Sequence, residues 1–157
     1  MLDVNSWTDV LIRLGIATAL GGLVGLERQI HHGAAGVRTY MIVSLGAAAF
    51  TATGAGLTPG DPAAVTRIIQ GLAAGVGFLG AGTIFQLKTT LEVRGLNTAS
   101  ALWLSAAVGT ACGVGMYAIA VVASLLSVIV LTIVSPLLRA MGMSATGHTE
   151  PPPSSNA

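Results

Sequence analysis

Most charged side chains of this sequence lie at the ends of long apolar segments. Glu27 and Arg28 end the first such segment, Arg38 begins the second, and Arg67 begins the third. Because Glu27 is an acidic residue among cations, we expect it to pair with a neighbouring arginine or to contact a cation. A single carboxylate is a weak magnesium site, since Mg²⁺ is usually held by one or two carboxylates and keeps several waters. Ion pairing or cation contact is therefore the expected chemistry.

Arg94 precedes the fourth apolar segment, and Asn97, Thr98 and Ser100 begin it. Helix capping explains at least one of these three polar residues, and their polar groups are also expected to line a small cytoplasmic vestibule with Glu27. Anchoring of the span ends is the alternative, because a charge at the bilayer centre costs at least about 2.5–3.5 kcal/mol and a charge at a span end avoids most of this.

The sequence shows no catalytic set. It has no Ser/His/Asp arrangement with a local signature, no paired carboxylates and no CxxC pattern. His31 and His32 are adjacent, but too few further ligands lie near them for a metal site. We therefore expect a protein that is not an enzyme and binds no cofactor, and we assign no metal ligands.

Glycines recur at a spacing of four residues. Gly75-Val-Gly77-Phe-Leu-Gly80 matches the GxGxxG pattern, but nucleotide binding needs a strand before the motif and a helix after it, and this motif lies inside an apolar segment. Close helix packing in a membrane is the favoured interpretation. The alternative is a partly unwound helix over residues 75–82 whose free backbone groups face an ion. The predicted packing residues are Gly21, Gly25, Gly71, Gly75, Gly77, Gly80, Gly82, Gly109 and Gly113.

Composition indicates a membrane protein. Hydrophobic residues make up 53% of the 157 residues and charged residues 8%, whereas soluble domains have about 25% charged residues. Uncharged stretches cover residues 14–26, 39–60, 68–87 and 95–138. Because a bilayer core takes about 20 helical residues, the last stretch must turn, and Gly113-Val-Gly115 is the best break. We predict an all-α, polytopic helix bundle with about five transmembrane helices.

The predicted membrane domain covers residues 1–143, with spans at about 8–27, 37–57, 65–86, 96–113 and 116–138. Residues 144–157 are polar and proline-rich, which predicts a disordered tail. Asp9 and Arg13 have the i,i+4 spacing of a helical ion pair. Asp61-Pro62 indicates a turn or the start of a helix.

The distribution of cations predicts the orientation. In a five-span arrangement the first and third connections and Arg139 share one face, and only Arg13 and Arg67 lie towards the other. The positive-inside rule then puts the N-terminus outside and the C-terminus in the cytoplasm. The expected partners are the lipid bilayer, a second copy of the chain or another membrane protein. The net charge of +1 gives no reason to expect nucleic acid.

Four blocks of the sequence resemble the MgtC/SapB family over about residues 8–138. They are Gly25-Leu-Glu-Arg-Gln29, Ala35-Gly-Val-Arg-Thr39, Arg67-Ile-Ile-Gln-Gly71 leading into the glycine-rich run 75–82, and Val93-Arg-Gly-Leu-Asn-Thr-Ala-Ser100 with Trp103. The order and combination of the blocks are specific, although each block alone is not. Carried over to this sequence, the resemblance implies a functional polar cluster of Glu27, Arg28, Arg38, Arg67, Arg94, Asn97 and Thr98.

The resemblance implies a multi-pass protein of the bacterial inner membrane. It implies an association with growth under magnesium limitation and, in some pathogens, with virulence. The leading hypothesis is a non-enzymatic protein that modulates another membrane protein or the ion balance. An ion or small-solute transporter, for magnesium or proton-coupled, and a structural assembly factor are the alternatives.

The sequence departs from the family pattern in two respects. Many members place an acidic residue close before the arginine that matches Arg67, and here Asp61 lies six residues ahead of it. Many members also carry a soluble C-terminal domain. This sequence is expected to have the membrane domain and a short tail, without regulation through such a domain.

Overall fold

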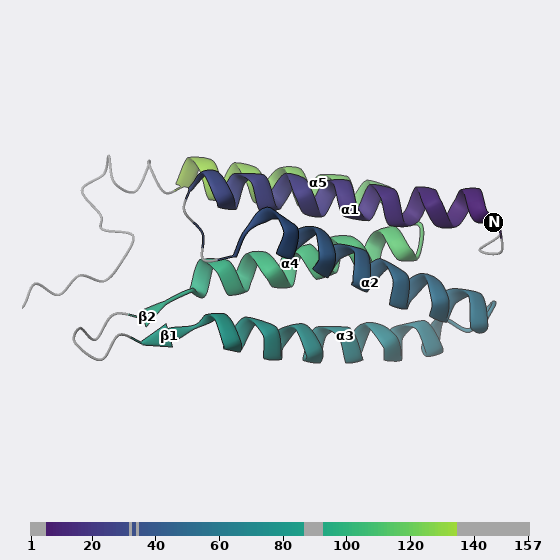
Figure 1. Cartoon of the computed structure of the whole chain (residues 1–157). Helices are drawn as coiled ribbons and strands as arrows, with labels where there is room; N and C mark the ends of the chain where they lie inside the picture. The colour runs from purple at the N-terminus through teal and green to yellow at the C-terminus, as the bar shows by residue number, and fades with distance from the viewer. Residues whose placement is uncertain (1–5, 32, 34, 87–92, 135–157) are drawn as a thin grey trace, which may run out of the picture.

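The computed structural model describes residues 6–31, 33, 35–86 and 93–134. Within these residues, successive helices run antiparallel and form an elongated bundle (Figure 1). The helices are α1 (Trp7–Ile30), α2 (Val37–Leu57), α3 (Pro62–Thr83), α4 (Leu96–Gly113) and α5 (Tyr117–Ile129), which continues as a π-helical segment, η1 (Val130–Val134). The predicted all-α bundle with five helices is confirmed. The predicted tail at 144–157 lies outside the described residues.

α3 begins three residues earlier than the predicted span. Asp61 Oδ1 accepts hydrogen bonds from the backbone N–H groups of Ala63 (2.9 Å) and Ala64 (3.1 Å). Pro62 follows at the first helical position, where its missing N–H is not needed. The helix start indicated by Asp61-Pro62 is therefore correct, and the boundary at residue 65, placed by hydropathy, was too late.

A short β-ribbon connects α3 and α4 and corrects the predicted end of the third span. The helix ends at Thr83, and Ile84 takes an extended conformation. The strand β1 (Phe85–Gln86) then pairs antiparallel with β2 (Val93–Arg94). The chain enters α4 through Gly95, whose φ of 96° is accessible to glycine without strain. The uncharged stretch of the sequence extends beyond the end of α3 because its last residues form β1.

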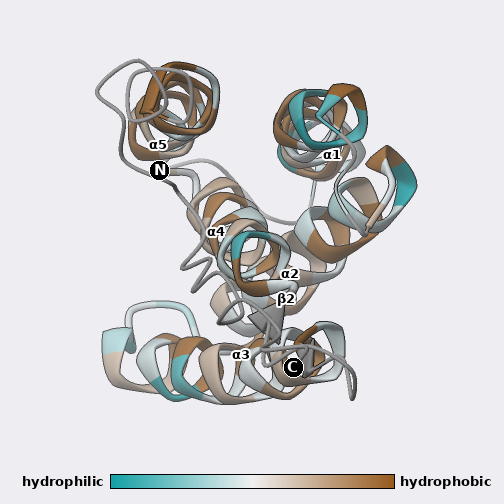
Figure 2. Ribbon diagram, turned by 90° about the vertical axis from the view of Figure 1, so that its left-hand side faces the viewer, coloured by the Kyte–Doolittle hydropathy of each residue, from teal (hydrophilic) through white to brown (hydrophobic). Residues whose placement is uncertain are grey.

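α4 lies at the centre of the bundle. It packs against α1, α2, α3 and α5. The end-on view shows α3 on one side of α4 and α1 with α5 on the other (Figure 2). Among the described residues, α1, α2, α3 and the segment Tyr117–Val134 are long and apolar enough to cross a membrane, whereas α4 is not singled out by hydropathy. Because its neighbours cover much of α4, the helix accommodates buried Thr98 and Ser105. The protein is a multi-pass membrane protein.

Glycines allow α1 to approach α2 closely. A Cβ atom added at Gly21 would lie 2.7 Å from both the Ser44 Cβ and the Tyr40 carbonyl oxygen. A Cβ atom added at Gly25 would lie 2.9 Å from the Val37 Cα. Real side chains do not approach backbone this closely, so both positions require glycine at this helix separation.

The contact between α2 and α4 depends on glycine in the same way. A Cβ atom at Gly109 would overlap the backbone of Ser44, and one at Gly113 would overlap the Thr51 hydroxyl. Gly80 makes an ordinary contact, with its added Cβ 3.5 Å from the Ala99 Cβ, between α3 and α4.

The remaining predicted packing glycines make no helix contact within this chain. An added Cβ atom would meet nothing within 4 Å at Gly71, Gly75, Gly77 or Gly82. The physical reason is the direction of the α3 side chains: its buried residue Val76 faces the bundle, and these glycines face away from it. Among the described residues nothing in the chain packs against these four positions, so their predicted packing role stays a prediction and would involve another molecule.

Candidate functional site

Three helix ends meet where part of the polar cluster was predicted. Glu27 lies in the last turns of α1, Tyr40 in the first turns of α2, and Thr98 in the first turn of α4. All three are buried. The Tyr40 side chain lies close to those of Arg28 and Thr98, but its buried hydroxyl has no partner at hydrogen-bonding geometry. The meeting point of α1, α2 and α4 is therefore polar and incompletely bonded.

The Glu27 carboxylate is the least satisfied group of this site. The residue is 7% exposed, and among the described residues no donor meets its carboxylate oxygens at hydrogen-bonding geometry. The His31 Nδ1 lies 3.1 Å from Glu27 Oε1 and 3.0 Å from the Glu27 carbonyl oxygen. His31 is half exposed, so it stands between water and the carboxylate. A buried carboxylate without hydrogen bonds is energetically costly, which marks Glu27 as a candidate functional residue.

Of the three arginines expected as partners of Glu27, Arg28 and Arg38 do not pair with it in the structure, and pairing with Arg94 stays a prediction. Within the described part of the chain, the salt-bridge partner of Glu27 is His31. Arg28 instead lies beside the connection that follows α1: a Cβ atom added at Gly33 would lie 3.2 Å from its Nε and Nη2. Arg38 is exposed at the start of α2. The Arg94 backbone lies in β2, and its side chain is outside the described part.

Arg67 does not belong to this site. It lies in the second turn of α3, which begins at the opposite end of the bundle from Glu27 (Figure 1). The antiparallel course of α2 and α3 imposes this placement, so one predicted cluster is divided between two ends. Asn97 lies near the Glu27 end but is exposed, unlike Thr98.

Sequence reasoning missed Tyr40 as a member of the site. One signal was available: a tyrosine near the start of a membrane helix brings a hydroxyl group that normally finds a partner when buried. His31 was considered only as a metal ligand. Its position four residues after Glu27 on the same helix face indicated the contact that the structure shows.

The opposite end of α1 carries the predicted ion pair. Arg13 Nε donates to Asp9 Oδ2 at 2.7 Å, and Arg13 Nη1 donates to the Gly113 carbonyl oxygen at 2.6 Å. The spacing predicted the pair, which is confirmed. It did not show that both residues are buried or that Arg13 ties α1 to the end of α4.

The middle of the bundle has no unwound helix. Residues 75–82 lie inside the continuous helix α3, so the alternative of a broken helix with free backbone groups is wrong. The buried hydroxyls of Ser44, Thr51 and Ser105 each donate to a backbone carbonyl oxygen, at 2.8, 2.8 and 2.9 Å. These hydroxyls therefore already have hydrogen-bond partners, and those of Ser44 and Ser105 join two helices. Among the residues described, no three His, Cys, Asp or Glu side chains come together to hold a metal.

The sequence matches the MgtC family over residues 14–140. The chain belongs to the MgtC family. Similar proteins include Protein MgtC of Brucella abortus, 45% identical over 129 residues (82% of this chain and 52% of that protein). Protein MgtC of Salmonella typhimurium is 40% identical over 116 residues (74% and 48%), and an uncharacterized protein of Synechocystis sp. is 44% identical over 131 residues (83% and 54%). The chain spans about half the length of these relatives. No solved structure matches it.

This MgtC-family protein has buried charges at both ends of α1. Glu27 follows Asp9 by 18 positions, which is about 27 Å along a helix and close to the thickness of a bilayer core. Asp9 is paired with Arg13, whereas the Glu27 carboxylate accepts no hydrogen bond. The Asp9 end is therefore a structural tie, and the Glu27 end is the candidate functional site.

Proposed function

We propose that this chain is a bacterial inner-membrane protein that supports magnesium homeostasis and growth at low magnesium. It acts by modulating another membrane protein or the ion balance of the membrane. The observation that carries the proposal is the buried, incompletely bonded Glu27 carboxylate in a chain of the MgtC family. Such a group responds to protons, cations or a neighbouring chain, because each of them relieves its unfavourable burial.

The outward side of α3 supports modulation of another membrane protein. It carries Gly71 and Gly75 with open space at both Cβ positions, together with exposed Phe78. Glycines spaced in this way allow close approach of a second membrane helix. The partner is another membrane protein or a second copy of this chain.

For the orientation, we propose that the Glu27 end faces the cytoplasm, with the N-terminus outside. The support is the group of cations at that end: Arg28 closes α1 and Arg38 opens α2. At the other end Arg13 is neutralised by Asp9. Among the described residues, Arg67 is then the cation that remains at that end. Cations of short connections favour the cytoplasmic side.

Complementation tests the proposed function. A strain lacking the gene should grow poorly in low magnesium and recover with the wild-type gene. Glu27→Gln, which keeps the shape and removes the charge, should fail to restore growth and membrane potential at equal protein level. Asp61→Asn is the matched control, because it neutralises an exposed carboxylate that caps α3 at the end of the bundle opposite Glu27. If deletion itself leaves growth and membrane potential unchanged in low magnesium, the proposed function is rejected.

Cation transport is the second candidate, and the same Glu27 carboxylate favours it. Folded protein in liposomes would then move magnesium or protons above the rate of empty vesicles, and Glu27→Gln would abolish the flux. Folded protein without flux, combined with failed complementation by Glu27→Gln, supports the modulator over the transporter.

A further inference from the structure

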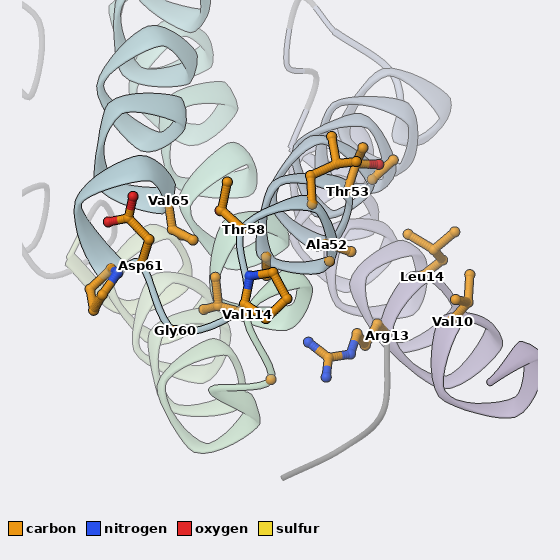
Figure 3. Close-up of a pocket in the computed structure, with 17 residues that line it drawn as sticks. Val10, Arg13, Leu14, Ala52, Thr53, Thr58, Gly60, Asp61, Val65 and Val114 are labelled. Atoms are coloured by element: carbon orange, nitrogen blue, oxygen red, sulfur yellow. The ribbon is translucent and has the colours of Figure 1, made fainter. Parts of the chain in front are cut away.

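A pocket of about 1130 Å³ opens at the end of the bundle opposite Glu27 (Figure 3). It is enclosed by the start of α1, the second half of α2, the connection to α3 and the turn between α4 and α5. Small and apolar side chains form most of its lining, among them Val10, Leu14, Ala52, Val65 and Val114. Ligand pockets are typically of this size and are lined by apolar residues with a few polar groups that fix orientation.

The main polar group of this pocket is Arg13. Although the residue is only 4% exposed, it is part of the pocket lining, and its guanidinium group points into the space beside Val114 (Figure 3). A guanidinium group has five N–H donors. One on Nε bonds Asp9 and one on Nη1 bonds Gly113. The remaining donors suit the oxygens of a phosphate group, which arginine binds through two parallel hydrogen bonds.

The position of the pocket favours a lipid as the source of that phosphate. Trp7, in the first turn of α1, is 84% exposed, and exposed tryptophans of membrane proteins lie at the headgroup level. The pocket is at the same end of the bundle. Its apolar walls, Val10, Leu14 and Val65, suit the first part of an acyl chain.

The charges around the pocket favour one class of headgroup. Arg13 is balanced by Asp9, and Asp61 adds a negative charge at the rim. Asp61 uses Oδ1 to cap α3, which leaves Oδ2 for another donor. The C-terminal carbonyl groups of α2 carry partial negative charge nearby. An anionic headgroup would add a further negative charge, whereas a zwitterionic headgroup adds none and brings an ammonium group.

We propose that this pocket binds one zwitterionic phospholipid with a primary ammonium group. Its phosphate accepts hydrogen bonds from Arg13, its ammonium faces Asp61 and the end of α2, and its acyl chains leave along α1. The inference is independent of the proposed role in magnesium homeostasis. It requires only that this end of the bundle lies in a leaflet that contains such a lipid.

Native mass spectrometry of the full chain tests this proposal. The protein is released from nanodiscs that contain equal amounts of phosphatidylethanolamine, phosphatidylcholine and phosphatidylglycerol. We expect one retained lipid per chain, with phosphatidylethanolamine favoured about tenfold, the equivalent of one hydrogen bond to a charged group. Phosphatidylcholine lacks the ammonium N–H groups, and phosphatidylglycerol lacks the positive charge.

Two variants connect the lipid to the pocket. Ala55→Phe fills the pocket from α2, so it should abolish retention without touching Arg13. Ala107→Phe makes the same change at an exposed position of α4 outside the pocket lining and should retain lipid as wild type does. Arg13→Lys keeps the charge but loses the planar pair of donors, so retention should fall about tenfold if one hydrogen bond to a charged group is lost.

Three results would overturn the proposal. One is equal retention of the three lipids by wild-type protein. Another is full retention by Ala55→Phe with a normal unfolding transition. The third is displacement of the lipid by millimolar inorganic phosphate, which would identify a site for the free anion. None of these results bears on growth in low magnesium, so the two proposals fail separately.

Discussion

At the scale of single residues, the buried hydroxyl groups of this bundle fall into two kinds. Ser105 donates to the Tyr40 carbonyl oxygen at 2.9 Å, and Ser44 donates to the Ala17 carbonyl oxygen at 2.8 Å. Each of these bonds joins two helices. The Tyr40 hydroxyl is equally buried and lies close to the side chains of Arg28 and Thr98, but in the described part of the chain it has no partner at hydrogen-bonding geometry. The hydroxyls of Ser44 and Ser105 stabilise the fold by joining helices, whereas the Tyr40 hydroxyl is available to the candidate site.

These two kinds of hydroxyl predict opposite effects of removal. Ser105→Ala should lower the free energy of unfolding by about 1 kcal/mol, because it removes one hydrogen bond. Tyr40→Phe should leave stability unchanged or raise it, since it removes a buried polar group that has no partner. Unfolding of the two variants in detergent micelles, followed by circular dichroism, measures the difference. Equal destabilisation by both would mean that the Tyr40 hydroxyl is bonded in solution.

The Asp9–Arg13 pair should contribute more stability than the Asp61 cap. Asp9→Ala leaves the buried Arg13 without its counter-ion, which costs about 3 kcal/mol for a buried pair. Asp61→Ala removes a helix cap at an exposed position, which costs about 1 kcal/mol. The same unfolding assay ranks the two. The reverse order would show that Arg13 finds other partners when Asp9 is removed.

At the scale of the helices, glycines divide according to what lies beyond the absent Cβ. Gly109 contacts the backbone of Ser44 on α2, whereas Gly75 on α3 has open space. Gly109→Leu should therefore separate α2 from α4 and prevent stable folding. Gly75→Leu should preserve the folded chain and weaken its association with another membrane helix. Size-exclusion chromatography and circular dichroism in detergent distinguish these outcomes.

This prediction corrects the expectation drawn from glycine spacing alone. Spacing treats Gly21 and Gly75 alike, as possible contacts between molecules. The structure puts Gly21 against Tyr40 and Ser44 within the chain, so Gly21→Leu should affect folding and not oligomer size. If Gly75→Leu leaves both folding and association unchanged, the outward side of α3 faces lipid.

Hydropathy and spacing predicted most of the helices because lipid imposes a simple rule on them. Uncharged segments of membrane length become helices, and α2 and α4 have the expected bounds. The rule does not cover the connection between α3 and α4, where uncharged residues form β1. At the start of α3, the capping residue Asp61 and the following Pro62 predicted the helix boundary better than hydropathy did.

The candidate site was only partly predictable. Glu27 was identified because a carboxylate at a span end needs a partner, and the structure shows that it is buried with unbonded oxygens. Arg67 was grouped with it on motif membership, although the antiparallel order of α2 and α3 separates them. Tyr40 was missed because it joins the site only through the contact between α2 and α4. No pattern in the sequence predicts that contact.

At the scale of the whole molecule, the central place of α4 explains its composition. α4 packs against α1, α2, α3 and α5, so most of its residues face other helices and fewer of them face lipid. Its requirement is close packing, which Gly109 and Ala106 provide. Hydropathy therefore identifies the outer helices of such a bundle better than the inner one.

The proposed orientation makes a prediction for the whole chain that labelling from one side of the membrane can test. Ile30 and Ala63 are exposed at opposite ends of the bundle. A membrane-impermeant maleimide applied to spheroplasts should label Ala63→Cys at once and Ile30→Cys only after the membrane is opened. Cys112 is fully buried and should remain unlabelled in the folded wild type, which controls for background labelling. The reverse pattern would put Glu27 and its cations outside, where a change in cytoplasmic magnesium or proton concentration does not reach them.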